Sequence, residues 1–410
     1  MTLGLFGGYG IELEYAIVDR ASLAVRPIAD EVLRHFAGSY VGDWDDGPIA
    51  WSNELALHVI ELKTNGPAPS LAGVAGAFQD SLLRLENALR GMNARLLPGG
   101  MHPTMDPQRE FKRWTHDYGE VYGAYDRIFD CRGHGWSNLQ SCHLNLPFAS
   151  DDEFGRLHLA ARALLPLLPA LAASSPFCEG RHTGWVDWRL QVYRHNQKRV
   201  PRIAGLVVPE PVTTREAYYD QVLRPIWRDI APLDPDGLLQ EEWLNSRGVV
   251  PKFFRDALEI RVLDVQECPA ADLAICALVT AVLRALCEER WAKRSDLAAL
   301  GTESLAAVLW DVAQKGDQAT IAHTPLLRAL GMPAEARTAQ AVWQRLAEAV
   351  LPDVGALDPL LVRPLQVILR QGPLARRMLT AVGTDPDRAA LLTLQQQLAD
   401  CLRAGASFGA

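Results

Sequence analysis

The sequence predicts an α+β fold built on an antiparallel β-sheet, and two observations lead to this prediction. In the first two-thirds of the 410-residue chain, strand-like and helical segments are mixed without the regular alternation that a parallel sheet requires. From about residue 291, Leu- and Ala-rich segments with helical spacing follow one another, separated by Gly and Pro. We therefore expect a mixed body over residues 1–290 and an all-helical region over residues 291–410 packed against it.

The first strand is expected in GIELEYAIVD, residues 10–19, where apolar residues alternate with Glu12, Glu14 and Ala16. The stretch GDWDDGP, rich in acidic residues and glycine, predicts a loop. WSNELALHVIELKTN then predicts a strand that stops at Gly66 and Pro67. These segments open the sheet of the body.

Later segments continue the mixed pattern. Leucine spacing over Leu71–Met92 predicts a helix, and ARLLPGGMHPTMDP predicts a short strand and a loop. WSNLQSCHLNLPF predicts a strand that ends at Pro147, and a helix is expected over Glu153–Ala173. LEIRVLD predicts another strand, and a helix over Asp272–Lys293 is expected to begin just after Pro269.

The composition is that of an ordinary globular protein, with 49% hydrophobic and 22% charged residues. A net charge of −8 argues against general binding to nucleic acid or to an anionic membrane, because both need basic patches. The seven cysteines form no CxxC pair and lie mostly in apolar runs, which is typical of reduced, packed thiols. The first residues lack the basic segment of a signal peptide. We predict a cytoplasmic protein, and the sequence gives no indication of its oligomeric state.

Four strand-like segments each carry a pair of polar residues: Glu12 and Glu14, Glu54 and Glu61, His143 and Asn145, and Glu259 and Arg261. Two glutamates ~4 Å apart repel by ~4 kcal/mol at an effective dielectric near 20. Several on one sheet face would raise each other's pKa unless cations intervene. Carboxylates with a single histidine suit Mg²⁺ or Mn²⁺ better than Zn²⁺. The four pairs therefore predict a divalent-metal site on the sheet.

Each of these signals also has a structural interpretation. A pair of glutamates on a strand can be solvated surface, and Glu259 with Arg261 can be a local ion pair. Glu54 and Glu61 are seven residues apart, so on an unbroken strand they face opposite sides. Either a β-bulge lies between them, or Glu54 lies on the loop before the strand, or one of them leaves the site.

Two further candidates are less specific. Arg181 and Arg189 could bind a substrate carboxylate bidentately, or could stack on neighbouring tryptophans. His102 lies between Gly and Pro residues that mark a turn, where a structural role is the simpler interpretation. The chain has no GxxxxGK[ST] or GxGxxG phosphate loop, no GxSxG and no HExxH motif. Chemistry on ATP or metal must therefore come from side chains on strands.

Six pieces of the sequence, in order, resemble glutamate–cysteine ligase family 2, a group of bacterial carboxylate–amine ligases: GIELEYAIVD, NELALHVIELKTNGP, GGMHPTMDP, QSCHLNLPF, SSPFCEGRHTG and LEIRVLDVQECP. The resemblance implies a glutamine-synthetase-like fold, in which the concave face of a curved antiparallel sheet binds ATP, metal ions and an amino acid. It places this site in the body of residues 1–290. It implies metal ligands at Glu12, Glu54, Glu61, His143 and Glu259.

The resemblance also assigns other roles. Glu14 lies beside the ligands, Asn145 would line the amino-acid pocket, and Arg261 would face the transferred phosphoryl group. Apart from the resemblance, the expected mechanism has Arg181 or Arg189 fix the substrate carboxylate. Cys142 and Cys178 depart from the family pattern, as does the segment of residues 194–213, so the acceptor amine stays open.

The expected function is an ATP- and Mg²⁺-dependent ligase, or one using Mn²⁺, that joins glutamate and cysteine through a γ-glutamyl phosphate, as in glutathione biosynthesis. Its partners would be ATP and amino acids. A ligase for another carboxylate and amine is the alternative within the same mechanism. Outside that mechanism, a phosphagen-type guanidino kinase uses a related sheet, and the cluster of polar residues could serve a metal-dependent amide hydrolase. A binding protein without catalytic activity would be expected to lose some of the acidic ligands, and this sequence has a nearly full set.

Overall fold

The strands of the body pair into an open antiparallel sheet in the computed structural model, which describes residues 2–353 and 357–409. Seven of its eight strands follow the order β2-β3-β4-β1-β6-β10-β9, and the eighth, β5, pairs with the C-terminal end of β1. Their bounds are β1 Gly10–Asp19, β2 Asp43–Asp46, β3 Ile49–Asn53, β4 Val59–Thr64, β5 Ala94–Leu97, β6 Ser141–Pro147, β9 Val249–Lys252 and β10 Ala257–Asp264. The predicted α+β class is confirmed.

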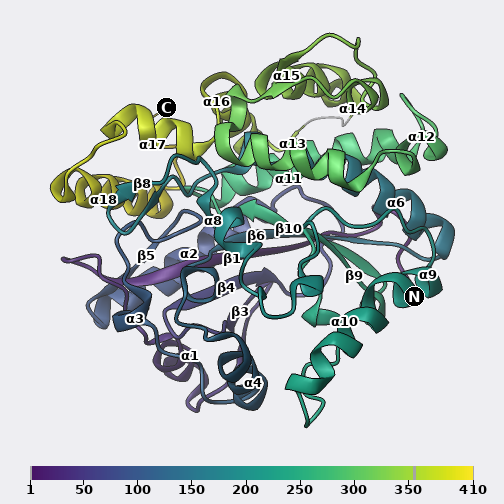
Figure 1. The fold of residues 1–410 in the computed structure, drawn as a ribbon. Coiled ribbons are helices and arrows are strands. Elements are labelled where there is room, and N and C mark those ends of the chain that lie inside the picture. The colour runs from purple at the N-terminus through teal and green to yellow at the C-terminus, as the bar shows by residue number, and fades with distance from the viewer. Residues whose placement is uncertain (1, 354–356, 410) are drawn as a thin grey trace.

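The helices of the first 290 residues surround this sheet (Figure 1). Their bounds are α1 Ala29–Ala37, α2 Val74–Gly91, α3 Pro107–Glu110, α4 Gly119–Phe129, α5 His134–Ser137, α6 Asp151–Leu164, α7 Pro169–Ala172, α8 Trp188–Tyr193, α9 Arg215–Tyr218, α10 Arg224–Ile230 and α11 Pro269–Cys287. A small hairpin, β7 Phe177–Cys178 with β8 Arg181–His182, lies apart from the main sheet.

The C-terminal region is helical, as expected, apart from the two-residue strand pair β11 Thr320–Ile321 and β12 Arg337–Thr338. In Figure 1 its helices, green to yellow, form a layer along one side of the sheet. They are α12 Arg294–Ala298, α13 Thr302–Lys315, α14 Thr324–Ala329, α15 Ala339–Val350, α16 Pro359–Gln371, α17 Leu374–Val382 and α18 Arg388–Ala404. The division of the chain at residue 290 stays a prediction, because α11 packs against both α6 and α16.

Three expectations about elements are corrected. The stretch GDWDDGP forms strand β2 and a turn, because Asp46 binds Arg84 and Ser81 of α2 and Trp44 pairs with Trp51. Residues 51–65 form two strands, β3 and β4, joined by a loop over residues 54–58. The helix expected over 153–173 is broken near Pro166, since proline lacks the N–H that an α-helix needs.

The core lies between the sheet and the helices behind it. Ile11, Leu13 and Tyr15 of β1 are fully buried and belong to one cluster with Phe78 and Leu82 of α2. Helix α11 is long and apolar enough to cross a membrane, but 89% of its most apolar window is buried inside the protein, so it is a core helix here. The opposite positions of β1, at Glu12 and Glu14, are left to form the polar face of the sheet.

Candidate active site

The pairing register brings polar residues of four strands onto one face of the sheet. Glu12 of β1 lies opposite Lys63 of β4 on one side and His143 of β6 on the other. Glu14 lies opposite Glu61. Because directly opposed residues of antiparallel strands project on the same side, these side chains share one face. Glu259 of β10 lies opposite Asn145 of β6, so residues from all four predicted polar pairs meet on this polar face of the sheet.

Glu12 and His143 form the centre of the polar face. His143 Nδ1 is 2.8 Å from Glu12 Oε2, and Asn145 Nδ2 donates to Glu12 Oε1 at 3.1 Å. Burial alone would raise the pKa of Glu12, but the hydrogen bond and charge of His143 lower it well below the usual range. The pKa of His143 is raised despite its burial, because Glu259, Glu12 and Glu14 surround it.

Glu14 is held by Ser141, at the start of β6. The Ser141 N–H and hydroxyl both donate to Glu14 Oε2, at 2.7 and 2.9 Å. The same hydroxyl lies 2.9 Å from His143 Nε2, which is 3.8 Å from Glu14 Oε1. Ser141 therefore fixes the relative position of Glu14 and His143.

One end of the polar face carries more carboxylates than nearby cations. Glu61 accepts from the Ser52 hydroxyl at 2.7 Å, and Lys63 Nζ is 3.5 Å away. Lys63 is shared, because its Nζ is 2.7 Å from Asp43 Oδ1. Burial and the charge of Glu12 raise the pKa of Glu61 to about 7. At this end of the polar face, which we call the acidic end, the carboxylates therefore outnumber the nearby positive charges.

Glu54 belongs to the acidic end as well. It directly follows β3 on the loop that precedes β4, so the second arrangement expected from its spacing to Glu61 is the one found. Burial and the negative charges of Glu14 and Glu61 raise the pKa of Glu54 well above its usual range. The loop therefore replaces a bulge as the device that brings Glu54 toward the other glutamates.

At the other end of the polar face, Glu259 of β10 is fully buried between two cations. Arg261 Nε is 3.0 Å from Glu259 Oε1, and Lys252 of β9 pairs with Oε2. Burial would raise the pKa of Glu259, but Arg261 and Lys252 lower it. Burial would lower the pKa of Arg261, but Glu259 raises it above its usual range, so Arg261 stays charged.

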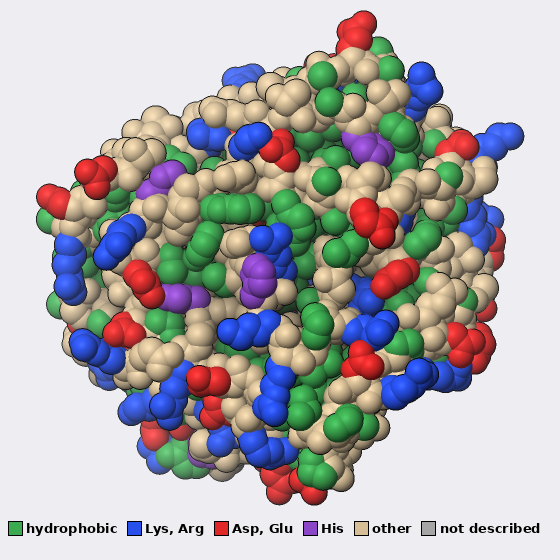
Figure 2. Space-filling view, in the orientation of Figure 1, with side chains coloured by type: hydrophobic (Ala, Val, Ile, Leu, Met, Phe, Trp, Pro, Cys, Tyr) green, Lys and Arg blue, Asp and Glu red, His purple; other side chains and the backbone are tan. Residues whose placement is uncertain are grey.

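The donor set fits a divalent cation. Ligand atoms of Glu12, His143 and Glu259 lie within 4.8 Å of one another, and so do those of Glu14, Glu61 and His143. Glu54 completes neither group of three. Carboxylate oxygens with one imidazole suit Mg²⁺ or Mn²⁺. Figure 2 shows Lys, Arg and His side chains near the middle of the face that is turned toward the viewer.

The two arginines predicted to bind substrate lie elsewhere. Arg189, on α8, is buried, with Nη1 3.4 Å from Asp264 Oδ1 and Nη2 donating to the Arg261 carbonyl at 3.0 Å. It therefore supports β10 behind Arg261. Arg181 is exposed on β8, and in the described part of the chain no hydrogen bond or ion pair joins it to the polar face. A substrate-binding role stays a prediction for both.

Comparison with known proteins identifies the family. A model described as glutamate–cysteine ligase family 2 matches residues 9–392. The chain belongs to this family. It is 29% identical over 358 residues to a Nocardioides protein named "Putative glutamate--cysteine ligase 2-1", covering 86% of this chain and 85% of that protein. An uncharacterised Archaeoglobus fulgidus protein is 40% identical over 280 residues, which are 68% of this chain and 75% of the relative.

Solved structures support the same fold. Glutamate–cysteine ligase of Francisella tularensis, in complex with AMP, aligns with a TM-score of 0.61 at 14% identity, covering 98% of this chain and 90% of the other. A bifunctional glutathione synthetase from Pasteurella multocida aligns with a TM-score of 0.56 at 16% identity, covering 98% of this chain and 52% of the other. The predicted family and the class of enzyme, a ligase of the glutamate–cysteine ligase type, are confirmed.

In this member of glutamate–cysteine ligase family 2, the polar face also contains residues that the sequence analysis did not predict. These are Ser52, Lys63, Ser141 and Lys252, which contact the predicted glutamates. Period-two spacing could have found two of them, because Lys63 follows Glu61 by two residues and Ser141 precedes His143 by two. Lys252 lies on β9, which the sequence did not predict.

The remaining candidates are structural. His102 is buried with Nε2 2.7 Å from the Leu23 carbonyl, and burial lowers its pKa to about 4. All seven cysteines are free, six of them buried, which matches the expectation of packed thiols. Cys142 points away from the polar face, with its Sγ 3.6 Å from Cys276 Sγ of α11. This contact lies in the core between the sheet and α11.

Proposed function

We propose that the protein is an ATP- and Mg²⁺-dependent ligase that joins the γ-carboxylate of glutamate to the amine of cysteine. The observation that carries the proposal is the polar face itself. Carboxylates and a histidine from β1, β4 and β6 converge at one end, and Lys252 and Arg261 supply positive charge at the other. A face with negative charge at one end and positive charge at the other suits a metal–nucleotide complex next to the phosphoryl group that is being transferred. The family, and the AMP bound to the Francisella neighbour, support a nucleotide as a substrate.

The reaction proceeds in two balanced steps. An oxygen of the glutamate γ-carboxylate attacks the γ-phosphorus of ATP, the bond to the bridging oxygen breaks, and ADP leaves. The cysteine amine then attacks the carbonyl carbon of the acyl phosphate, phosphate departs with the bonding electrons, and the nitrogen loses a proton. Phosphoryl transfer depends mostly on positioning and charge neutralisation, which a polar face of this kind can provide.

The metal ligands are Glu12, Glu54, Glu61, His143 and Glu259, with Glu14 beside them. When bound, Mg²⁺ supplies neutralisation of the phosphate oxygens. Glu61 and Glu54, whose pKa values are raised by burial and by neighbouring carboxylates, favour such an ion at the acidic end. Ser141 keeps Glu14 and His143 in place before any ligand arrives.

The protein's own cations act at the opposite end. Arg261 stays charged beside Glu259 and stabilises the oxygens of the moving phosphoryl group. Lys252, held by the same carboxylate, adds a second positive charge. Glu14 lies next to the reacting atoms, and Asn145, bound to Glu12, contacts the amino-acid substrate. Arg181 or Arg189 would fix its α-carboxylate. We place the site in the body of residues 1–290 and the enzyme in the cytoplasm, where ATP and amino acids are available.

The test is a screen for phosphate release from ATP with pairs of amino acids, run with Mg²⁺ and with EDTA, and with mass spectrometry of the product. We expect release with glutamate plus cysteine that needs both amino acids and the metal, and a product with the mass of γ-glutamylcysteine. Release with a different carboxylate and amine would replace the substrates. Amide hydrolysis without nucleotide would overturn the ligase mechanism.

A further inference from the structure

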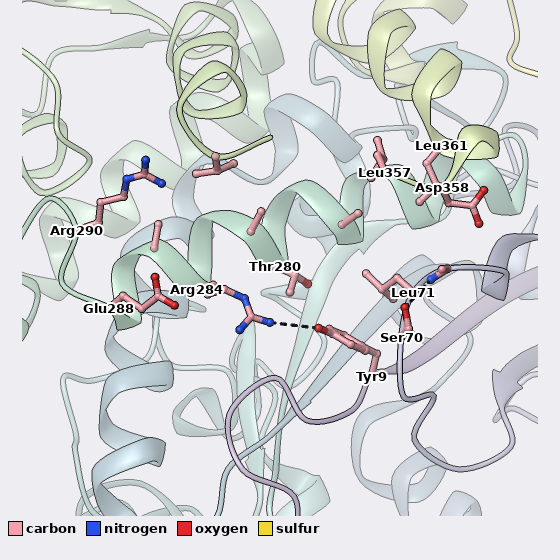
Figure 3. Close-up of a pocket in the computed structure, with 15 residues that line it drawn as sticks. Tyr9, Ser70, Leu71, Thr280, Arg284, Glu288, Arg290, Leu357, Asp358 and Leu361 are labelled. Carbon is pink, nitrogen blue, oxygen red and sulfur yellow. Dashed lines mark hydrogen bonds between the residues drawn. The ribbon is translucent and has the colours of Figure 1, made fainter. Parts of the chain in front are cut away.

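A second cavity lies away from the polar face, between α11, the segment before β1, the loop before α2 and the start of α16 (Figure 3). Its volume is about 440 Å³, and none of the residues that line it belongs to the possible metal ligands. Cavities of this size with a few convergent polar groups are the usual form of small-molecule sites. The chemistry of the lining indicates which molecule would fit.

One side of the cavity offers donors to an anion. Arg284 of α11 holds its guanidinium 4.4 Å from the centre of the Phe6 ring, and its Nη2 lies 3.5 Å from the Tyr9 hydroxyl. In the described ranges, 2–353 and 357–409, no carboxylate pairs with Arg284. Figure 3 shows Arg284 and Thr280 both directed from α11 toward Tyr9. An arginine without an acidic partner is suited to a carboxylate ligand.

Thr280 supplies an independent observation. The residue is 5% exposed, and its hydroxyl is buried with no hydrogen-bond partner among the described residues. A buried hydroxyl without a partner costs free energy, so a native protein normally satisfies it. Thr280 lines the cavity and lies one helical turn before Arg284 on α11. A ligand carboxylate could accept hydrogen bonds from both the Thr280 hydroxyl and the Arg284 guanidinium.

The rest of the lining is apolar or balanced in charge. Ala277, Ala281 and Leu361 form part of an apolar wall. The other charged lining residues are Arg290, Glu288 and Asp358, and Asp358 is occupied by the N–H groups of Gly73 and Leu360. With two arginines and two acids in the lining, the cavity has no excess charge for a polyanion such as ATP.

We propose that this cavity binds a small monocarboxylate with a short apolar tail, its carboxylate on Arg284, Thr280 and Tyr9 and its tail along Ala277 and Ala281. The site is separate from the ligase site and holds a molecule of different charge. It therefore goes beyond the proposed function, and its occupancy does not depend on catalysis.

The experiment is titration calorimetry of the full chain, without nucleotide or metal, using sodium octanoate and its neutral analogue octanamide. We expect saturable octanoate binding to the wild type and binding of octanamide that is weaker by about tenfold or more, because a hydrogen bond to a charged group contributes at least that factor. Equal binding of octanamide would overturn the carboxylate assignment. Absence of saturable octanoate binding would overturn the site.

Variants locate the binding. Arg284→Met keeps the contact with Phe6 and should weaken octanoate binding about tenfold, and Ala281→Phe, which fills the cavity, should abolish it. Arg90→Met, on the exposed end of α2, is the matched control and should bind as the wild type does. Glu12→Gln should also bind normally, so a loss there would contradict a separate site. Unchanged binding in Arg284→Met would overturn the proposal even if Ala281→Phe fails to fold.

Discussion

Glu61, on the polar face, and Glu267, elsewhere in the interior, have different partners in this fold. Glu267, just after β10, has each oxygen bound by Arg377, at 2.6 and 3.2 Å, and both side chains are buried. Glu61 is equally hidden from solvent, yet it shares one lysine with Asp43 and has its pKa raised to about 7. One acid has its own cation, and the other does not.

The difference teaches how to separate structural acids from functional ones. A buried carboxylate with its own arginine needs nothing more, and removing it leaves an unpaired cation. A buried carboxylate whose nearest neighbours are other carboxylates stays ionised only if something else brings positive charge. By this criterion we expect Glu54 and Glu61 to be functional and Glu267 to be structural.

The largest expected effect concerns turnover. Arg261→Ala and Glu12→Gln should each lower kcat by ~10²–10³, because each removes a group that acts on the charge that develops in the transition state. Steady-state phosphate release measures the loss. Glu348→Gln, an exposed glutamate on α15, is the control and should keep wild-type turnover. Full activity in either variant would show that the substituted residue of the polar face is not needed for catalysis.

The next effect concerns stability. Glu267→Gln should lower the free energy of unfolding by about 3 kcal/mol or more, since Arg377 would be left buried without its partner. In metal-free buffer, Glu61→Gln should not lower that free energy, because the change relieves repulsion. Urea unfolding with EDTA compares the two variants. An equal loss in both would mean that the polar face is as well paired as the interior.

Histidines extend the comparison to pH. On the polar face, acids raise the pKa of His143, whereas burial lowers the pKa of His158 on α6 from 6.5 to about 4. Between pH 6.5 and about 4, His158 is therefore protonated in the unfolded chain but neutral in the folded chain. The stability that His158 contributes is complete above pH 6.5 and is lost as the pH falls toward 4, by up to about 3 kcal/mol.

Unfolding by urea at a series of pH values tests this expectation. His158→Gln cannot titrate and can keep a hydrogen bond to the Val212 carbonyl, which His158 Nδ1 contacts at 2.8 Å. Its stability should fall less steeply between pH 6.5 and 4 than that of the wild type. Parallel curves for the two proteins would contradict a neutral His158 in the folded state.

The smallest effect concerns the metal. Glu61→Gln removes one oxygen ligand and one negative charge from the acidic end, so the Mg²⁺ concentration needed for half-maximal activity should rise about tenfold. The Mg²⁺-dependent increase in Tm should shrink in parallel. Asp311→Asn, at a half-buried acid on α13 far from the polar face in sequence, serves as the control. An unchanged Mg²⁺ requirement would remove Glu61 from the ligand set.

The sequence predicted much of the site, because alternation of polar and apolar residues is a local signal. Strands β1, β6 and β10 and their polar pairs follow from period-two spacing. Strand β2 was missed, because what holds its acids is distant in sequence: Arg84 and Ser81 bind Asp46, and Lys63 binds Asp43.

Other parts of the site lay beyond sequence reasoning for similar reasons. Strand β9 is a short edge strand with Pro251 inside it, a position where proline is tolerated but which weakens any strand pattern. Because β9 was not predicted, Lys252 at its end was not predicted as part of the polar face. Arg189 was predicted near a substrate, and its burial against Asp264 could not be inferred, because that contact spans 75 residues. A long-range contact decides the position of Arg189, whereas a weak local pattern hides β9.

The order of the strands also determines when the site can exist during folding. The hydrogen bond between His143 and Glu12 joins residues 131 positions apart, and β10 pairs with β6 across more than 100 positions. Loops of this length close slowly, and the chain has no assembled acid cluster until β1, β6 and β10 have all paired. An ion held there would bind the native state alone. It would therefore lengthen the lifetime of the folded protein without accelerating its formation.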